Sequence, residues 1–420
     1  MKNLFALLLT LAAFLLIAPF AEAADYTQEK ILKELEELRQ TVKAQELKIQ
    51  QLKATLETKA EAKTAAKTEG SESSKISLVN SAIDRLAIKG DLRVRYEHRD
   101  RNDPSDSYDT TNRFRARFRL GGIWKNDTEN WEAGAGLATG TIVGTGTNDT
   151  WGEENVFEKG DIRLDYAYAK HKLDDFSITL GQQINPFQMS WLFWDTDLRP
   201  TGLTTHYAHK IGAFATLGAY ALRFYTGTKG FGDDTAMLYA GQAGYSSKIG
   251  KVKLTAAAGY QHFDQSFSNA EMAKNSKYDF HIADLYAKAS IPAGIAELSP
   301  YGQIWTNLGA DGTLSQAGGN LKPDSEDLGW ILGLDAKIKL VTLGYAYAVV
   351  GADSVYDGMK DADFGAGLGV TTDVKGHRAS AFVDLTKNVS TGITAFLFEA
   401  DERTGKQDVG IYQFDVNYKF

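Results

Sequence analysis

The 420-residue chain contains no cysteine, only 7 prolines and no excess of positive charge. The absence of cysteine excludes disulfide bonds, thiolate metal sites, covalently attached haem and lipid attachment through cysteine. A formal net charge of -8 argues against a nucleic-acid-binding protein. The sequence also has no HExxH motif, no phosphate-binding loop and no Gly-x-Ser-x-Gly elbow. We therefore expect no enzyme activity, no cofactor and no metal site.

Long hydrophobic runs are missing beyond the N-terminal region. There, Lys2 is followed by an apolar run from Leu4 to Pro19 and then by Ala21-Glu22-Ala23. A charged start, a short apolar run and a small-residue cleavage pattern predict a secretory signal peptide over residues 1–23. A transmembrane anchor is the alternative, but the run is short and ends in small residues. No later segment approaches the ~20 apolar residues that a membrane-spanning helix needs.

Glycine and aromatic residues, in contrast, are abundant, with 40 Gly, 19 Tyr and 21 Phe. The mean hydropathy is nevertheless negative, at -0.30. This combination is typical of a transmembrane β-barrel, because half of the strand residues of such a barrel face water in the lumen.

The segment 24–57 has a helical period. Apolar residues follow one another at spacings of four and three: Ile31, Leu35, Leu38, Val42, Ile49, Leu52 and Leu56. Gln45 occupies the one core position of this pattern that is not apolar. This pattern predicts a coiled coil that associates with its own copies, and we expect a homotrimer. A single amphipathic helix lying on a barrel rim is the alternative. Residues 58–85 are rich in Ala, Lys, Thr, Glu, Gly and Ser and are predicted to be a flexible linker.

From residue 86 onward the sequence alternates with a period of two. In the second predicted strand, Phe114, Ala116, Phe118 and Leu120 alternate with four arginines. Such alternation predicts a strand with one apolar face and one polar face. Arginines on every second position fit poorly in a buried soluble core but cost little on the wall of a water-filled lumen. The predicted pore-lining residues are Asp91, Arg93, Arg95, Arg113, Arg115, Arg117, Arg119, Asp161, Arg163 and Asp165.

About sixteen strands are predicted over residues 86–420, separated alternately by short turns and long polar segments. They include 160–172, with Tyr166 and Tyr168 on its apolar face, and the neighbours 204–215 and 219–229. Short periplasmic turns and longer outer loops are typical of outer-membrane barrels, and periplasmic termini require an even strand number. The predicted fold is an all-β antiparallel transmembrane barrel, preceded by an N-terminal α-helical coiled coil. A barrel of about 16–18 strands leaves an aqueous channel.

The last predicted strand carries an apolar row on one face, ending at the C-terminal residue: Phe414, Val416, Tyr418 and Phe420. The residues between them are polar, so the row suits a surface that faces lipid. The pattern resembles the C-terminal assembly signal that bacterial outer-membrane barrels present to their assembly machinery. We therefore expect outer-membrane lipid and the barrel assembly machinery as partners.

Four segments, in this order along the chain, carry a family resemblance: GDLRVRY from Gly90, NRFRAR from Asn112, GAGLATG from Gly134 and WDTDLRP from Trp194. The chain resembles the bacterial porins and, more closely, the putative-porin family, whose members carry a signal peptide and a short coiled coil before the barrel. The resemblance implies a trimeric, water-filled diffusion channel in the bacterial outer membrane.

In general porins the third outer loop folds into the barrel and narrows it. The third long segment here runs from Pro186 to Leu203, and its predicted constriction residues are Trp191, Trp194, Asp195, Asp197 and Arg199. We expect the aromatic residues to anchor the loop to the lumen wall and the acids to face the arginines across the path. The alternative is a loop folded over a neighbouring subunit. For the arginines, the alternative is plain lumen lining neutralised by Asp91, Glu97, Asp161 and Asp165.

The segment 352–373 contains Asp353, Asp357, Asp361 and Asp363. We interpret it as a solvated surface loop, with a bridge to a divalent cation or lipopolysaccharide as the alternative. The leading functional hypothesis is a passive porin. The alternative is an envelope tether, in which the periplasmic coiled coil reaches toward peptidoglycan.

Overall fold

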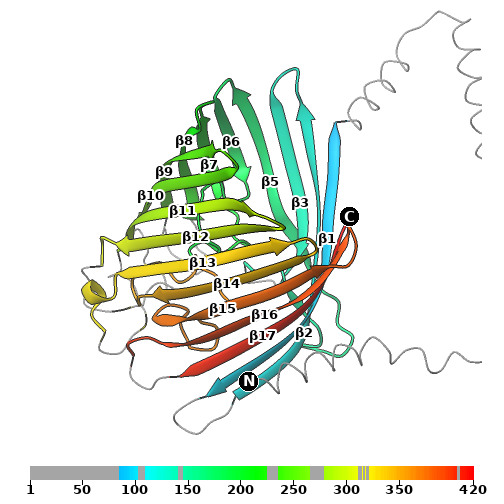
Figure 1. Cartoon of the computed structure of the whole chain (residues 1–420), viewed down its shortest axis with the longest axis vertical. Coiled ribbons are helices and arrows are strands. Elements are labelled where there is room, and N and C mark those ends of the chain that lie inside the picture. The colour runs from blue at the N-terminus through cyan, green and yellow to red at the C-terminus, as the bar shows by residue number, and fades with distance from the viewer. Residues whose placement is uncertain are drawn as a thin grey trace, which may run out of the picture. The chain divides into compact units, whose positions relative to one another are not determined.

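The computed structural model describes residues 85–102, 109–140, 145–224, 235–264, 279–310, 315, 317, 321–403 and 407–420 (Figure 1). The predicted signal peptide and coiled coil, and all of the predicted linker except Arg85, lie outside these residues and stay predictions. Within the described ranges, no helix is long and apolar enough to cross a bilayer.

Among the described residues, seventeen strands form one antiparallel sheet, and sixteen of them close into a barrel, so the predicted antiparallel barrel and its strand number are confirmed. Each strand of the ring pairs with its neighbour in chain order, and β17 pairs with β1 to complete the ring (Figure 1). The short β4 lies outside the ring sequence, at the edge of β2, so β3 pairs directly with β5. A 3-10 helix, η2 (Pro323–Ser325), precedes β13. The strands are β1 Leu86–Asn102, β2 Asp109–Asn126, β3 Trp131–Thr139, β4 Asp149–Thr150, β5 Ile162–Leu173, β6 Phe176–Gln182, β7 Thr201–Ala208, β8 Ala213–Phe224, β9 Thr235–Ile249, β10 Val252–Phe263, β11 His281–Ala293, β12 Ala296–Asn307, β13 Leu328–Ile338, β14 Val341–Val350, β15 Val374–Asp384, β16 Val389–Ala400 and β17 Asp408–Lys419.

The two faces of the sheet differ as the period of two predicts. Phe114 on β2 and Val416 on β17 point outward, and each is 52% exposed. Arg95 on β1 is only 6% exposed and shares the inner face with Asp415, its cross-strand partner on β17. An exposed apolar outer face suits the hydrocarbon of a bilayer. The row of the last strand lies on this outer face, and its members are all between 41% and 52% exposed: Phe414, Val416, Tyr418 and Phe420.

The predicted outward assignment of Tyr166 and Tyr168 is wrong, because β5 contains a β-bulge. Leu164 pairs with Leu137 and Tyr166 with Gly136, so Asp165 is the extra residue between them. One extra residue moves every following side chain to the opposite face. Tyr166 therefore lies inside the barrel, where its ring covers Gly136, and a Cβ at that glycine would overlap the ring.

The predicted strand 204–215 is also wrong, since it contains a turn. Strand β7 ends at Ala208 and β8 begins at Ala213. Between them, Gly212 has a φ of 102°, a backbone conformation that glycine adopts readily and other residues rarely adopt. Its N–H donates to the carbonyl of His209 over 2.9 Å. The apolar Ile211 lies in this turn and is exposed, so the sequence pattern of apolar residues continues across the turn.

Candidate functional site

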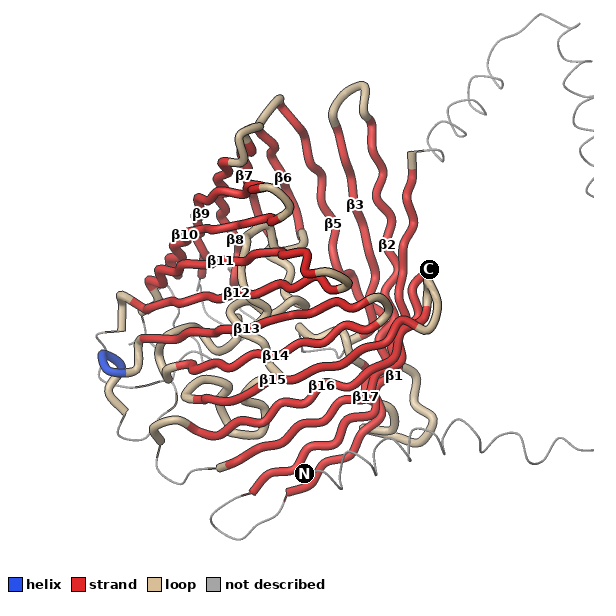
Figure 2. The backbone as a smooth tube through the Cα atoms, viewed as in Figure 1, coloured by secondary structure: helices blue, strands red, loops and turns tan. Residues whose placement is uncertain are grey.

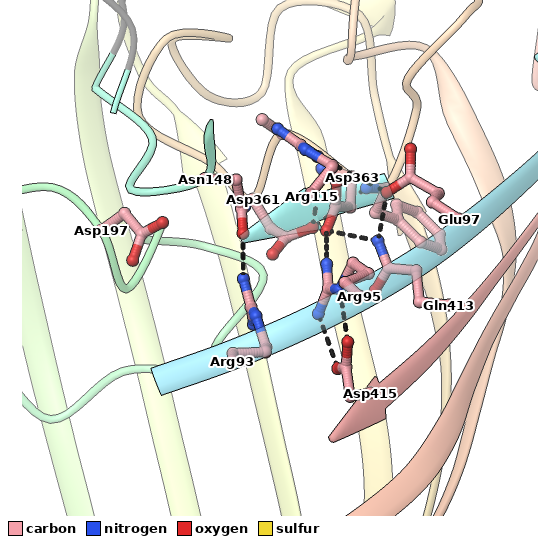
Figure 3. A network of polar contacts seen from close by, with 12 residues as sticks. Arg93, Arg95, Glu97, Arg115, Asn148, Asp197, Asp361, Asp363, Gln413 and Asp415 are labelled. Atoms are coloured by element: carbon pink, nitrogen blue, oxygen red, sulfur yellow. Dashed lines mark hydrogen bonds and ion pairs between the residues drawn. The ribbon is translucent and has the colours of Figure 1, made fainter. Parts of the chain in front are cut away.

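One stretch of the inner wall collects most of the predicted pore-lining charges. The β1–β2 register pairs Arg93 with Arg117 and Arg95 with Arg115. Side chains of directly opposite residues point to the same side of a sheet, so these arginines form one surface. We call this surface the arginine wall; it comprises Asp91, Arg93, Arg95, Glu97, Arg113, Arg115, Arg117, Arg119, Gln413 and Asp415. Figure 3 labels six of these residues: Arg93, Arg95, Glu97, Arg115, Gln413 and Asp415.

The arginine wall holds more positive than negative charge. Asp91 pairs with Arg117 and Arg119, over 2.8 Å in each case. Glu97 likewise serves two arginines, Arg113 and Arg115. Asp415 pairs with Arg95. The three strand carboxylates thus pair with five of the six arginines, and the wall carries a surplus of positive charge.

Arg93 is the wall arginine without an acidic partner. Its guanidinium donates to the side-chain oxygen of Asn148, a neutral residue next to β4 (Figure 3). Among the described residues, no carboxylate lies within ion-pair distance of Arg93, and its buried Nε has no hydrogen-bond partner. Arg93 is therefore the wall arginine whose charge is least compensated.

Loop 3, residues 183–200 between β6 and β7, lies against the inner faces of distant strands. The N–H of Ser190 donates to Gln303 Oε1 on β12 over 2.7 Å, and the N–H of Gln188 donates to Gln242 Oε1 on β9 over 2.8 Å. The Trp191 indole N–H donates to the Tyr301 hydroxyl over 2.8 Å. Phe193 is fully buried, with its ring centroid 5.1 Å from that of Trp305. These contacts place the aromatic run of loop 3 inside the ring of strands. Figure 2 shows loop backbone, in tan, within that ring.

The charged residues of loop 3 take different positions. Asp197 accepts hydrogen bonds from the N–H and hydroxyl of Thr147 and stands apart from Arg93 (Figure 3). Asp195 accepts the N–H of Asp197 over 2.8 Å. Arg199 instead forms a buried ion pair with Asp165 of β5 over 2.9 Å, so it fastens the loop to the wall.

The remaining predicted pore-lining residues lie near the start of β5. Arg163 lines a cavity of about 600 Å³ together with Asp165, Asp197 and Trp194. Asp161 precedes β5, is exposed, and forms no ion pair with any described residue. Asp161 therefore does not contribute to the neutralisation of the arginine wall.

Loop 7, residues 351–373 between β14 and β15, is not the solvated surface loop that we expected. Val355 and Phe364 are each 1% exposed. The N–H of Asp195 donates to the Met359 carbonyl over 2.8 Å, and the N–H of Asp361 donates to the Leu192 carbonyl over 2.9 Å. Loops 3 and 7 are therefore joined by their backbones inside the barrel.

Two acids of loop 7, Asp361 and Asp363, lie beside the arginine wall. The sequence pattern did not predict this position for them. Asp363 Oδ2 accepts a hydrogen bond from Gln413 over 2.9 Å and lies 3.6 Å from an Arg95 nitrogen (Figure 3). Desolvation opposes its charge, but Arg95 and its neighbours lower the pKa of Asp363 overall. Desolvation, followed by the charges of Asp363 and Asp195, raises the pKa of Asp361 to about 7. Only the number of acids in the segment hinted at such a role.

A metal site is not formed by the described part of the chain, where no three His, Asp or Glu side chains are arranged around a common point. The ring nitrogens of His262 and His281 lie 3.2 Å apart, near the end of β10 and at the start of β11. His281 also pairs with Asp279 over 2.8 Å. These groups interact with one another.

The arrangement resembles known channel proteins. A family model described as "Putative porin" matches residues 101–290. The resemblance to the putative porins is confirmed, and the chain forms a porin-like barrel.

Two solved structures are similar to this chain at low sequence identity. Pseudomonas putida OprB, in its high-pH structure, is 14% identical, with a TM-score of 0.53, and the match covers 81% of this chain and 96% of that chain. A triple mutant of Rhodopseudomonas blastica porin is 11% identical, with a TM-score of 0.46, and the match covers 80% of this chain and 100% of that chain. A comparison with curated protein sequences found no match. The likeness to OprB supports the fold.

Proposed function

We propose that this porin-like barrel is a passive porin, through which small hydrophilic solutes and ions diffuse in a water-filled lumen narrowed by loop 3. The observation that carries the proposal is the arginine wall on the inner face of β1 and β2. Six arginines on a barrel wall cost little only where water fills the lumen. A barrel of about 16 strands is also wide enough to leave an aqueous channel.

Separated charges support a selective passage. The arginine wall carries a cation surplus, whereas Asp195 and Asp197 of loop 3 have no arginine or lysine within ion-pair distance among the described residues. Opposite charges on two sides of a narrow path create a transverse field. Such a field orients small dipolar solutes and discriminates between ions.

The proposed assembly is a homotrimer in the outer membrane, with the coiled coil of residues 24–57 in the periplasm. The heptad pattern supports self-association. The exposed apolar outer face supports contact with outer-membrane lipid. The row that ends at Phe420 supports recognition by the barrel assembly machinery.

A planar-bilayer recording tests the proposal. The full mature chain is reconstituted under a salt gradient, and single insertions are recorded beside a blank with detergent alone. We expect stable conductance that rises in groups of three equal steps. A folded barrel, verified by its heat-dependent mobility on a denaturing gel, that stays closed at every voltage would contradict the proposal.

The heptad pattern also favours a second candidate function, an envelope tether. A helix of roughly 30 residues spans about 45 Å at about 1.5 Å per residue, enough to extend the chain toward peptidoglycan. Deletion of residues 25–75 separates the two functions. A tether predicts that the deletion loosens the envelope, whereas a porin without tether function predicts unchanged envelope integrity and unchanged conductance.

A further inference from the structure

Loop 7 is fastened inside the barrel at both of its ends. At the C-terminal end of loop 7, the fully buried Asp373 carboxylate accepts a hydrogen bond from the N–H of Glu402. It also forms an ion pair with Arg403 over 2.8 Å. Arg403 also donates to the carbonyls of Leu368 and Thr372 over 2.8 and 3.1 Å. One arginine from the next outer loop therefore holds the last turns of loop 7.

The start of loop 7 is held by side chains of β12. The Trp305 indole N–H donates to the Ser354 hydroxyl over 3.2 Å. The Asn307 amide donates to the Asp353 carbonyl over 2.9 Å. Both bonds are buried, so replacing them by bonds to water requires the loop to leave its position.

The middle of loop 7 turns around a buried lysine. Lys360 is 2% exposed, and its ammonium donates to the carbonyls of Asp361 and Phe364. A buried ammonium is tolerated when it is hydrogen-bonded, and these bonds close a tight turn. The N–H groups of Asp363 and Phe364 in turn donate to the Asp361 carboxylate. The turn thus presents Asp361 and Asp363 in a fixed arrangement.

We propose that loop 7 is a second selectivity-determining loop, in which Asp361 and Asp363 offset the surplus positive charge of the arginine wall while Arg403 and Asp373 hold the loop in place. The inference rests on the proposed porin function and concerns small ions. Without these two carboxylates, the negative charges of only the three strand acids oppose the positive charges of the six wall arginines. Anions then permeate more readily, and cations less readily.

Charge-neutralising variants test the selectivity. Asp361→Asn and Asp363→Asn keep the size and most hydrogen bonds of each side chain, and Asp324→Asn removes the same charge from an exposed position of η2. Under a potassium chloride gradient at about pH 8, each loop 7 variant should raise the chloride-to-potassium permeability ratio by about two- to fourfold, as expected for one charge about 5 Å from the ion path in screened water. Asp324→Asn should leave the ratio unchanged. Wild-type ratios in both loop 7 variants of a conducting protein would overturn the inference.

Thiol labelling tests the position of loop 7 without relying on conductance. The chain has no cysteine, so Ala362→Cys, at an exposed position between the two acids, introduces a single thiol. A cationic thiol reagent should label it faster than an anionic one, and Asp363→Asn should reduce that preference. Ser325→Cys on η2 is the matched exposed control, and its preference should not respond to Asp363→Asn.

Variants of Arg403 test the fastening. Arg403→Ala should accelerate labelling of Ala362→Cys and raise the conductance, whereas Arg403→Lys keeps the charge and should give an intermediate result. If the wild-type barrel never conducts but the labelling preference behaves as described, the porin function fails and the placement of the loop 7 acids stands. The inference would be overturned if Asp363→Asn left the reagent preference at Ala362→Cys unchanged and Arg403→Ala left its labelling rate unchanged.

Discussion

Arg95 on β1 and Asp415 on β17 lie opposite each other across the seam where the barrel closes, with Arg95 Nε 2.7 Å from Asp415 Oδ1. The two residues are 320 positions apart in the chain, so the ion pair forms only when the first and last strands meet. A second bond, from Arg95 Nη2 to Asp415 Oδ2 over 2.9 Å, makes the pair bidentate. The pair therefore links closure of the barrel to the charge balance of the arginine wall.

Loss of this pair should destabilise the closed barrel. Asp415→Ala leaves the buried Arg95 with a single ion-pair partner, the more distant Asp363. We expect the free energy of unfolding to fall by about 2–3 kcal/mol. Urea titration of tryptophan fluorescence in lipid vesicles measures the change. Asp408→Ala is the matched control on the same strand, since Asp408 is exposed and has no ion pair among the described residues. Equal midpoints for the two variants would contradict the prediction.

Gly136 should tolerate no side chain, because the Tyr166 ring occupies the space of its Cβ. Gly136→Ala is expected to lower the free energy of unfolding by about 1–3 kcal/mol through overpacking. Adding Tyr166→Leu should restore part of this loss. Gly146→Ala serves as the control, since a Cβ there meets nothing within 4 Å. The same titration checks all three variants, and a neutral Gly136→Ala would show that the ring moves aside.

Ion selectivity should depend on pH through Asp361. Its pKa of about 7 means that the carboxyl is protonated below that value and charged above it. Asp195 from loop 3, Lys360 and Asp363 from loop 7, and Arg95 beside Asp363 are the charged groups around it. Acidification from about pH 8 to about pH 6 removes this negative charge, so the reversal potential should move toward anions.

The matching control is Asp361→Asn, which has no proton to gain at this position. Burial lowers the pKa of the neighbouring Lys360 to about 8, so this ammonium gains a proton over the same pH range. The reversal potential of Asp361→Asn should therefore move less than that of the wild type. A wild-type reversal potential that does not move between these two pH values would refute the assignment.

Trp191 should anchor loop 3. Its indole N–H bonds to Tyr301, and the Arg378 guanidinium lies 4.8 Å from the ring centroid. Trp191→Ala removes both contacts, and we expect a larger single-channel conductance with a noisier open level. Trp151→Ala removes an indole that is 53% exposed outside the ring of strands, and it should leave the conductance unchanged. An unaltered conductance in Trp191→Ala would mean that the other loop contacts are sufficient.

The faces of most strands were predictable because a period of two is a local property. The arginines of β2 and their apolar neighbours alternate in the sequence itself, and the β1–β2 register preserves that alternation. Loop 3 was recognisable for a related reason, since four bulky apolar residues from Trp191 to Trp194 stand out in an otherwise polar connection. Local pattern therefore determined the strand number, the polar inner wall and the first candidate loop.

Tertiary structure decided the features that depend on partners far away in the chain. The bulge at Asp165 changes the faces of Tyr166 and Tyr168 only relative to β3, so no count along β5 alone reveals it. Loop 7 has no repeating pattern, and the burial of Val355 and Phe364 requires side chains from loop 3 and from strands on several sides. The sequence by itself determined which residues are charged and which face of each regular strand they occupy. Which charges meet, as Arg95 meets both Asp415 and Asp363, was decided by barrel closure and loop packing, because these contacts join residues that are hundreds of positions apart.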